Sequence, residues 1–489
     1  MSEQTHVLDD GLIGRPLARE RATYAAIALG GAILGLAAAV DPLLALAAAV
    51  GALLTGVVLA SPIAGLCILL ALSFFEEFDD VGGGPSVTKV VGLLLGVAWL
   101  GAIALASKAG THPRGLVARQ PVLAAALALF AVWVVVSNVW ATDLGLATDS
   151  VTRFALNFAL FPIVLAFVVE ARHVVALFAV YVAAAVASVG YGLLTNPTAG
   201  GPEAGRLAGA GINPNELGAV LVVAVIFGVA LGLVQSWHPL ARVAAFTGAG
   251  ISTVGLFLTL SRGALFGLAV AILVAPLAVG RGRRLAAVVV AAAAVFCAVA
   301  WFGVLASDDA RKRVTNPSAE GGSGRSDLWR VGWRMVEDHP IRGVGAGNFP
   351  ARSVDYLLRP GSTENDAYIV DTPKEPHNIY LAVLAELGIV GFLLFVTILV
   401  TALAAAIQAA REFTRRGQPV MDLLSRTLFL GLVGYLAALF FSSQLFEKQL
   451  WLLLAAAPAL LAIAQRAPGE ERMPAPLAGT RLARGRARH

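Results

Sequence analysis

Apolar and polar residues follow each other along this chain in long blocks rather than in short repeats. Apolar runs of about 18 to 22 residues recur between residues 22 and 465, and most are joined by short polar hairpins. A helix rises about 1.5 Å per residue, so such a run crosses a hydrocarbon layer roughly 30 Å thick. Lipid offers backbone amides no partner, which requires these runs to be helical. The pattern predicts an all-α polytopic membrane bundle of about 12–14 transmembrane helices. The predicted spans are 22–40, 43–60, 62–74, 88–107, 121–138, 151–170, 173–194, 215–235, 243–260, 263–280, 285–306, 378–408, 427–442 and 449–465.

One polar stretch, at 307–376, is far longer than the other connections. Loops in compact proteins rarely exceed about 15 residues without structure of their own, so we expect short helices here, one of them amphipathic over 327–336. Its length also makes it the first place to look for chemistry. The expected organisation is a cytoplasmic N-terminal segment at 1–21, transmembrane helices at 22–306, an extracytoplasmic loop at 307–376, transmembrane helices at 377–465 and a basic, disordered cytoplasmic tail at 466–489.

Composition favours a membrane protein over a soluble one. Hydrophobic residues make up 58% of the chain and charged residues 14%, with a mean hydropathy of +0.79. The apolar share of soluble domains is normally below half. The first apolar run is a full span behind a polar start, so no cleavable signal peptide is expected. Cys67 and Cys297 both lie inside apolar runs, which favours inert packing over a disulfide or a metal site.

The distribution of Lys and Arg predicts the orientation. Of 36 such residues, 21 lie in the N-terminal segment, in alternate short loops and in the tail, while 15 lie on the opposite side. Ten of these 15 belong to the 307–376 loop, which is too long to obey the positive-inside rule. Both termini should therefore be cytoplasmic and the long loop extracytoplasmic. Topology also accounts for the net charge of +5, and no basic stripe suited to nucleic acid is present.

Some cations remain in short loops on the extracytoplasmic side, where cations are disfavoured. Arg206 lies before an Asn-Pro-Asn sequence, and Arg262 lies in a tight turn between two spans. A guanidinium is a planar fork of donors that matches phosphate oxygens. Together with Arg325 of the long loop, these two arginines predict a site for a lipid-linked phosphate or diphosphate. The five cations in the short loops of this side are Lys89, Arg153, Arg206, Arg262 and Lys448.

Each arginine also has an ordinary structural interpretation. Arg206 would be a solvated loop charge, and Arg262 would extend from its helix end to lipid headgroups. Arg325 would form a surface ion pair with Asp327 or Glu337. These interpretations stay open at the level of sequence.

His377 is the histidine that lies where the long loop re-enters an apolar helix. A histidine titrates near neutrality, so it can accept a proton from a sugar hydroxyl as that hydroxyl attacks. The alternative is a helix-start histidine bonded to a loop carbonyl. Glu375 or Asp371 would be able to orient the imidazole, although both also fit solvated loop acids. His339, in the same loop, is the next candidate base, with Asp371.

Several catalytic motifs are missing from the sequence. No carboxylate pair stands at glycosidase spacing in an evident site, and neither a phosphate-binding Gly-x-x-x-x-Gly-Lys loop nor a His-Glu-x-x-His zinc motif occurs. We therefore expect an enzyme that uses no ATP, metal or other cofactor.

Six short motifs, taken in order, resemble the O-antigen ligase and polymerase family. The resemblance covers residues 200–440 and does not separate ligase from polymerase. The motifs are Gly205-Arg206-Leu207 with Asn213-Pro214-Asn215, Ser261-Arg262-Gly263, Gly324-Arg325-Ser326-Asp327-Leu328-Trp329, Pro340-Ile341-Arg342-Gly343-Val344-Gly345-Ala346-Gly347-Asn348-Phe349, Pro376-His377-Asn378-Ile379-Tyr380 and Glu386-Leu387-Gly388.

The resemblance implies an inverting glycosyltransferase of the bacterial inner membrane that works on the extracytoplasmic face. Its donor would be a glycan on undecaprenyl diphosphate, and its acceptor a lipid or glycan hydroxyl. Arg206 and Arg262 match family arginines that hold the diphosphate, Arg325 matches a loop arginine, and His377 matches the proposed base. The spacer within the long loop and the basic tail are not family signatures, which leaves the acceptor open.

Two other classes of function compete with this one. A polyprenyl-glycan flippase or other transporter would need many spans and basic residues, but its charges should lie near the bilayer midplane within inverted repeats. Here the charges lie at the outer rim and no clear repeat is found. A purely structural scaffold would leave the outward arginines unexplained.

Overall fold

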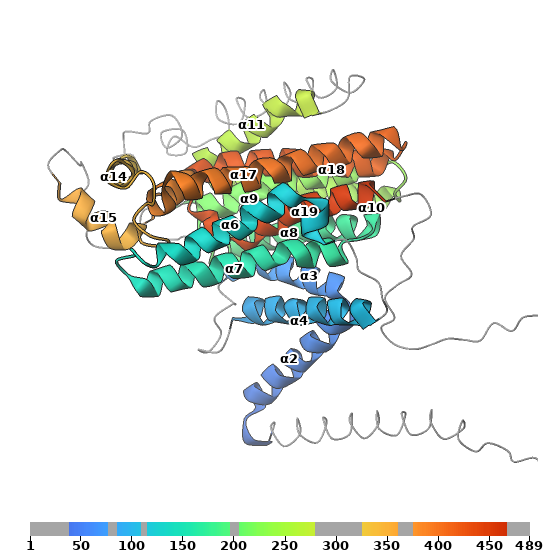
Figure 1. Cartoon of the computed structure of the whole chain (residues 1–489). Coiled ribbons are helices and arrows are strands. Elements are labelled where there is room, and N and C mark those ends of the chain that lie inside the picture. Colours follow the sequence, from blue (N-terminus) through green and yellow to red (C-terminus); the bar gives the residue numbers. More distant parts are fainter. Residues whose placement is uncertain are drawn as a thin grey trace, which may run out of the picture. The chain divides into compact units, whose positions relative to one another are not determined.

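A computed structural model describes residues 39–76, 86–108, 115–195, 205–278, 325–359 and 375–466. The chain divides into two compact units, Met1–Ser61 and Pro62–His489, and each is described by itself. The first contributes one described apolar helix, α2 (Pro42–Ala60) (Figure 1). The described part of the second is helical apart from loops and an isolated bridge between Phe75 and Ala210.

Eight of the described helices are long and apolar enough to cross a membrane, and four shorter helices are also apolar. This confirms the predicted all-α polytopic bundle. Twelve of the predicted spans fall on these helices, while 22–40 and 285–306 fall almost wholly outside the described residues. In the second unit the α-helices are α3 (Pro62–Leu72), α4 (Val87–Lys108), α5 (Leu116–Arg119), α6 (Pro121–Ser137), α7 (Leu144–Phe167), α8 (Ala171–Thr195), α9 (Pro214–Gly232), α10 (Pro239–Leu258), α11 (Arg262–Ala278), α14 (Arg325–Asp338), α15 (Phe349–Leu357), α17 (Ile379–Arg415), α18 (Pro419–Ala438) and α19 (Lys448–Ala464). Two short 3-10 helices, η6 (Leu439–Phe441) and η7 (Gln444–Phe446), join α18 to α19.

Local capping sets several helix starts. The Asn213 side chain accepts hydrogen bonds from the backbone amides of Asn215 and Glu216, and the Glu216 carboxylate accepts one from the Asn213 amide. These bonds form a capping box at the start of α9. The start of α7 lies seven residues before the predicted 151, because Asp143 caps the helix by accepting from the Leu146 amide at 3.1 Å. Periodicity does not reveal such polar first turns.

The core of the second unit forms around α9 and α19, whose residues are mostly buried. The first of these helices packs on α8, α10, α11 and α18, and the second packs on α7, α17 and α18. Trp451 of α19 is fully buried among the rings of Phe154, Phe158 and Phe161 from α7. Apolar packing on all sides fixes these two helices in the centre of the bundle.

The long helix α17 is broken at Gly388, which has φ 64° and ψ −169°. The break frees backbone groups that pair with the segment 340–348, called the docking loop below. The Ile389 amide donates to the Pro340 carbonyl at 2.8 Å, and the Val344 amide donates to the Ala385 carbonyl at 3.0 Å. A side chain at Gly388 would meet the Ile341 carbonyl at 2.2 Å, so only glycine permits this approach.

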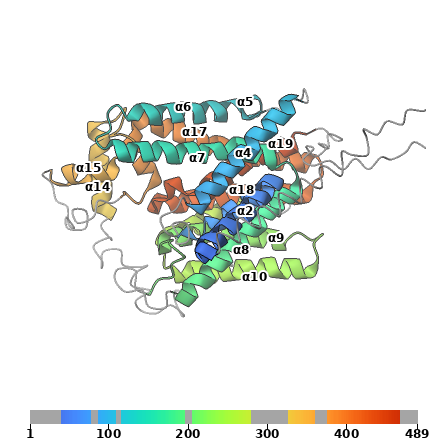
Figure 2. The same ribbon diagram turned by 90° about the horizontal axis from the view of Figure 1, so that it is seen from below.

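Glu386 completes the attachment of the docking loop. Its two carboxylate oxygens accept from the amides of Gly347 at 2.8 Å and Phe349 at 3.1 Å, the second of which begins α15. Asn348 is bonded to the backbone of Asp143 at the start of α7. These bonds hold α14 and α15 at one end of the bundle, beside the first turns of α17 (Figures 1 and 2).

The amphipathic helix predicted at 327–336 is confirmed as α14. Leu328, Val331 and Met335 lie on its buried face and pack against Phe349 and Tyr356 of α15. The described part of the long loop therefore packs around a small apolar core, to which α17 contributes Ala385. The expected domain boundaries stay a prediction.

Replacing Gly388 by Ala should destabilise the protein. The change adds left-handed strain and a clash with the Ile341 carbonyl, which together cost about 2 kcal/mol or more. Gly250→Ala, in the middle of α10 with nothing near its Cβ position, is the matched control and should be neutral or slightly stabilising. Thermal unfolding in detergent measures both, and equal stability of the two variants would contradict the assigned role of Gly388.

Candidate active site

Five short segments are linked by contacts at the end of the bundle where α9, α11, α17 and α19 begin. Hydrogen bonds and ring contacts connect all five segments, and the segment 439–448 contacts three of the others. Together they carry every residue that the sequence analysis proposed for chemistry, except those outside the described residues and His339. The segments are 205–215, 259–266, 325–329, 375–378 and 439–448.

Arg206 is held against the turn that precedes α11. Its Nε donates to the Thr259 carbonyl at 2.9 Å, and a terminal nitrogen donates to the Asn215 side chain at 2.8 Å. The neighbouring Leu207 amide donates to the Leu258 carbonyl at 2.9 Å. Arg206 is therefore half-buried and anchored to Thr259, which lies three residues before Arg262 in the sequence. This setting does not fit a freely solvated loop charge.

Arg262 is the first residue of α11 and is half-buried. Among the described residues its guanidinium forms no hydrogen bond or ion pair. The turn before it is tight, with Leu260 at φ 49° and the Ser261 hydroxyl accepting from the Ala264 amide at 3.3 Å. A cation held at this position has its donors available to an anionic ligand.

Aromatic rings connect the start of α11 with the His377 segment. Phe266 of α11 packs edge-on against Phe441 with ring centroids 5.7 Å apart. Phe441 in turn lies 6.1 Å from the Trp329 ring, and the Trp329 indole donates to the Pro376 carbonyl at 2.8 Å. These three aromatic rings thus bring the start of α11 and the His377 segment, which are far apart in sequence, together at one end of the bundle, called the His377 rim below.

Arg325 begins α14, one helical turn before Trp329, which places it near the same rim. Asp327, one of the two carboxylates suggested as its partner, is buried and forms an ion pair with Arg330 at 3.3 Å. His339 lies ten residues beyond Trp329, about 15 Å further along the helix direction. Partial burial and the charge of Arg342 lower the pKa of His339. Its position beyond the other end of α14 separates it from Arg206, Arg262 and Arg325, the arginines proposed to bind the diphosphate.

His377 has φ 49°, in the left-handed region that side chains other than glycine rarely adopt. Hydrogen bonds hold the backbone on both sides of His377. Asn378 accepts from the amides of Tyr380 and Leu381 at 3.0 Å each, and Pro376 is held by Trp329. Backbone strain of this kind costs of order 1–3 kcal/mol and is found disproportionately at functional sites.

Ser443 contacts the imidazole directly. Its hydroxyl oxygen lies 3.2 Å from Nδ1 of His377, and Ser443 also lies close enough to the Glu375 carboxyl group to affect its pKa. Desolvation raises the pKa of Glu375, while Ser443 and the charge of Arg153 oppose the rise.

Carboxylates occupy the side of the site towards α3 and α19. The carboxyl groups of Glu76 and Glu447 are in hydrogen-bonding contact, and Glu216 is close enough to act on both electrostatically. Arg153 lies over the Phe446 ring at 5.4 Å and pairs with Asp149 at 2.7 Å. The described part of the chain contains no group of three His, Cys, Asp or Glu residues arranged to hold a metal ion. Independence from metal stays a prediction.

Sequence reasoning gives no role to Ser443, nor to Asn215 and Trp329, which lie within the motifs of the resemblance. A polar Ser-Ser pair between two apolar runs is a weak signal for the first, and the Asn-Pro-Asn sequence is one for the second. Glu375, which the sequence offers as an orienting group, lies close to Ser443, and Ser443 contacts His377. Asp371 lies outside the described residues.

Comparison with known families identifies part of the chain. Residues 247–396 match the family model described as O-Antigen ligase, a narrower range than the 200–440 of the resemblance. The match includes Arg262, Arg325, His377, the docking loop and Gly388, whereas Arg206 and Ser443 lie outside it. No curated protein matches the chain. Together with the helical membrane fold, this match supports a membrane enzyme of the O-antigen ligase and polymerase family that acts on glycans.

Proposed function

We propose that this protein is an inverting membrane glycosyltransferase that moves a glycan from an undecaprenyl-diphosphate carrier to an acceptor hydroxyl. The supporting observation is the linkage, at one end of the bundle, of Arg206, Arg262 and the Arg325 helix start to His377. Three guanidinium groups suit a diphosphate, and a histidine suits a hydroxyl that must lose its proton. The proposed location is the extracytoplasmic face of the bacterial inner membrane, with both termini cytoplasmic.

The chemistry requires one bond to form and one to break. The acceptor oxygen attacks the anomeric carbon from the side opposite the diphosphate, so the configuration inverts. The bond from that carbon to the diphosphate oxygen breaks, and undecaprenyl diphosphate leaves with the electron pair. Arg206 and Arg262 would stabilise the charge that develops on its oxygens, a task in which one preorganised donor is commonly worth about 10²- to 10³-fold in rate.

His377 would take the proton of the attacking hydroxyl. With Glu375 ionised, the Ser443 hydroxyl would donate its one proton to that carboxylate and accept from Nδ1–H of His377. Nε2 is then left with a free lone pair, which is the state that a general base needs. The imidazolium formed during transfer would be stabilised through Ser443 by the Glu375 charge.

Purified protein incubated with an undecaprenyl-diphosphate glycan tests the proposed function. Release of undecaprenyl diphosphate with transfer to an added acceptor indicates a ligase. Growth of the glycan on the carrier without an acceptor indicates the alternative, a polymerase of the same family. Movement of intact donor across vesicle membranes without release of the carrier would instead indicate a flippase and overturn the proposal.

Arg262→Lys should fold normally and lose at least tenfold in turnover, because an ammonium cannot make the bidentate contact of a guanidinium. Arg206→Lys should lose turnover and also some thermal stability, since two of its hydrogen bonds are structural. Arg172→Lys, on an exposed arginine paired with Glu170, is the control and should behave as wild type. Full activity of Arg262→Lys would mean that this side chain only reaches towards headgroups.

His377→Ala should insert normally and transfer glycan several hundred-fold more slowly, within the roughly 10²- to 10⁴-fold range for loss of a general base. Donor binding should persist because the arginines remain. In the wild type, turnover should rise with pH through about 6 to 7, since only neutral imidazole accepts a proton. Chelators should leave the rate unchanged. Loss of donor binding with fast chemistry in bound complexes would assign His377 to positioning instead.

Ser443→Ala should lower turnover roughly tenfold while the KM for the donor stays constant, because one hydrogen bond to the base is lost. Loss of the hydroxyl should make the imidazolium of His377 less stable, so the rising limb of the pH–rate profile should move to lower pH. Ser443→Thr keeps the hydroxyl and should restore both. A lower rate with an unmoved pH profile would show that Ser443 is only structural.

A further inference from the structure

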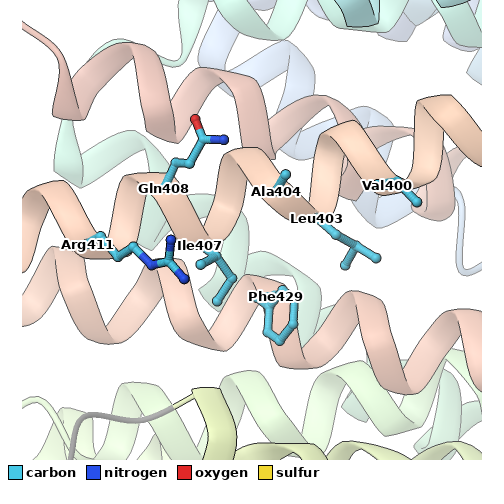
Figure 3. A pocket seen from close by; sticks show the side chains of 7 residues that line it. All are labelled: Val400, Leu403, Ala404, Ile407, Gln408, Arg411 and Phe429. Carbon is cyan, nitrogen blue, oxygen red and sulfur yellow. The ribbon is translucent and has the colours of Figure 1, made fainter.

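An apolar groove runs along the surface between α17 and α18, far from the candidate active site (Figure 3). Its volume is about 360 Å³. The residues from α17 recur every three or four positions, which places them on one face of that helix. The lining residues are Val400, Leu403, Ala404, Ile407, Gln408, Arg411 and Phe429.

The groove opens into a polar pocket at the C-terminal end of α17. The two spaces share Gln408 and Arg411, and the second space of about 250 Å³ is also lined by Glu412 and Arg415. Figure 3 shows Phe429 of α18 facing Ile407, with Arg411 beside it at one end of the apolar surface. An elongated apolar surface thus leads to a polar end.

Arg411 differs from its basic neighbours. Arg415 and Arg416 form ion pairs with Glu412 at 3.5 Å and 2.8 Å, and Arg426 pairs with Asp422 at 2.7 Å. Among the described residues Arg411 has no ion pair or hydrogen bond, and its side chain is exposed. Within the described part of this helix end, the three guanidinium groups of Arg411, Arg415 and Arg416 are balanced by one carboxylate, that of Glu412, which leaves a net positive charge among these residues.

The position of Arg411 determines the class of ligand. From Ile389, just after the break in α17, to Arg411 the helix is about 33 Å long, which matches the hydrocarbon thickness of roughly 30 Å. Arg411 therefore lies at the interface opposite the His377 end. The diphosphate of the proposed donor would be at the other interface, so the anion beside Arg411 has to come from the nearby leaflet.

We propose that this groove binds an anionic phospholipid. One acyl chain lies along the apolar face between Val400 and Phe429, and the phosphate lies against Arg411 with Arg415 beside it. A guanidinium at a membrane interface is stabilised by a phosphate, and basic pockets between transmembrane helices are known to bind anionic headgroups. The site is separate from the proposed glycosyl transfer, and its test needs no activity assay.

Binding of phosphatidylglycerol to the purified full-length protein in detergent tests the site. Native mass spectrometry and lipid-dependent thermal stabilisation would be compared with phosphatidylcholine of the same acyl chains. Wild type should bind phosphatidylglycerol preferentially, and Arg411→Gln should weaken that binding roughly tenfold by removing a charged hydrogen-bond donor. Phosphatidylcholine binding should be little changed by this substitution.

Two further variants make the result specific. Arg415→Gln removes a side chain that is already paired with Glu412 and 78% exposed, so it should weaken phosphatidylglycerol binding much less than Arg411→Gln. Ala404→Trp fills the groove and should reduce binding of both lipids. Unchanged binding in Arg411→Gln, equal binding of the two lipids by wild type, or unchanged binding in Ala404→Trp would each overturn the proposal.

Discussion

The candidate site depends on the break in α17 at Gly388. A continuous helix would satisfy its own backbone and leave the buried amides of the docking loop without these partners. The break releases the Ile389 amide and the Ala385 and Glu386 carbonyls, which pair with the loop at 2.8 to 3.0 Å. The carboxylate of Glu386 then holds the amides of Gly347 and Phe349. Because α14 ends and α15 begins at this loop, the position of Trp329 over the His377 segment follows from the same bonds.

The His377 rim is assembled from small polar contacts around a few rings. Trp329 fixes the Pro376 carbonyl, Asn378 caps α17, and Ser443 reaches the imidazole from the connection between α18 and α19. These contacts have the character of a preorganised site, since each one restrains a backbone or side-chain angle next to the proposed base. The positive φ of His377 is tolerated because both neighbours are held.

Arginines lie near both ends of α17, and their surroundings differ. At the His377 end, Arg206 is anchored to a carbonyl and an amide side chain, while the Arg262 guanidinium has no hydrogen bond or ion pair with the described residues. At the other end, acidic partners engage Arg415, Arg416 and Arg426 but not Arg411. In each setting the guanidinium without a partner in the described chain is the one that we assign to a phosphate. The same physical rule, that a cation at a membrane interface needs an anion, underlies both proposals.

The sequence by itself determined that the chain is an all-α membrane protein, because apolar runs of spanning length allow no other backbone solution in lipid. It also singled out Arg206, Arg262, Arg325 and His377, since cations on the disfavoured side and a helix-start histidine stand out locally. Tertiary structure decided what local pattern does not contain. The capped start of α7 at Asp143 is decided by a side-chain hydrogen bond, and the pairing of the Glu386-Leu387-Gly388 motif with the docking loop joins residues about forty positions apart. Ser443 comes next to His377 across 66 positions, and no periodicity can encode that contact. Helix formation depends on neighbours within a few residues, whereas a site depends on which distant helices pack together.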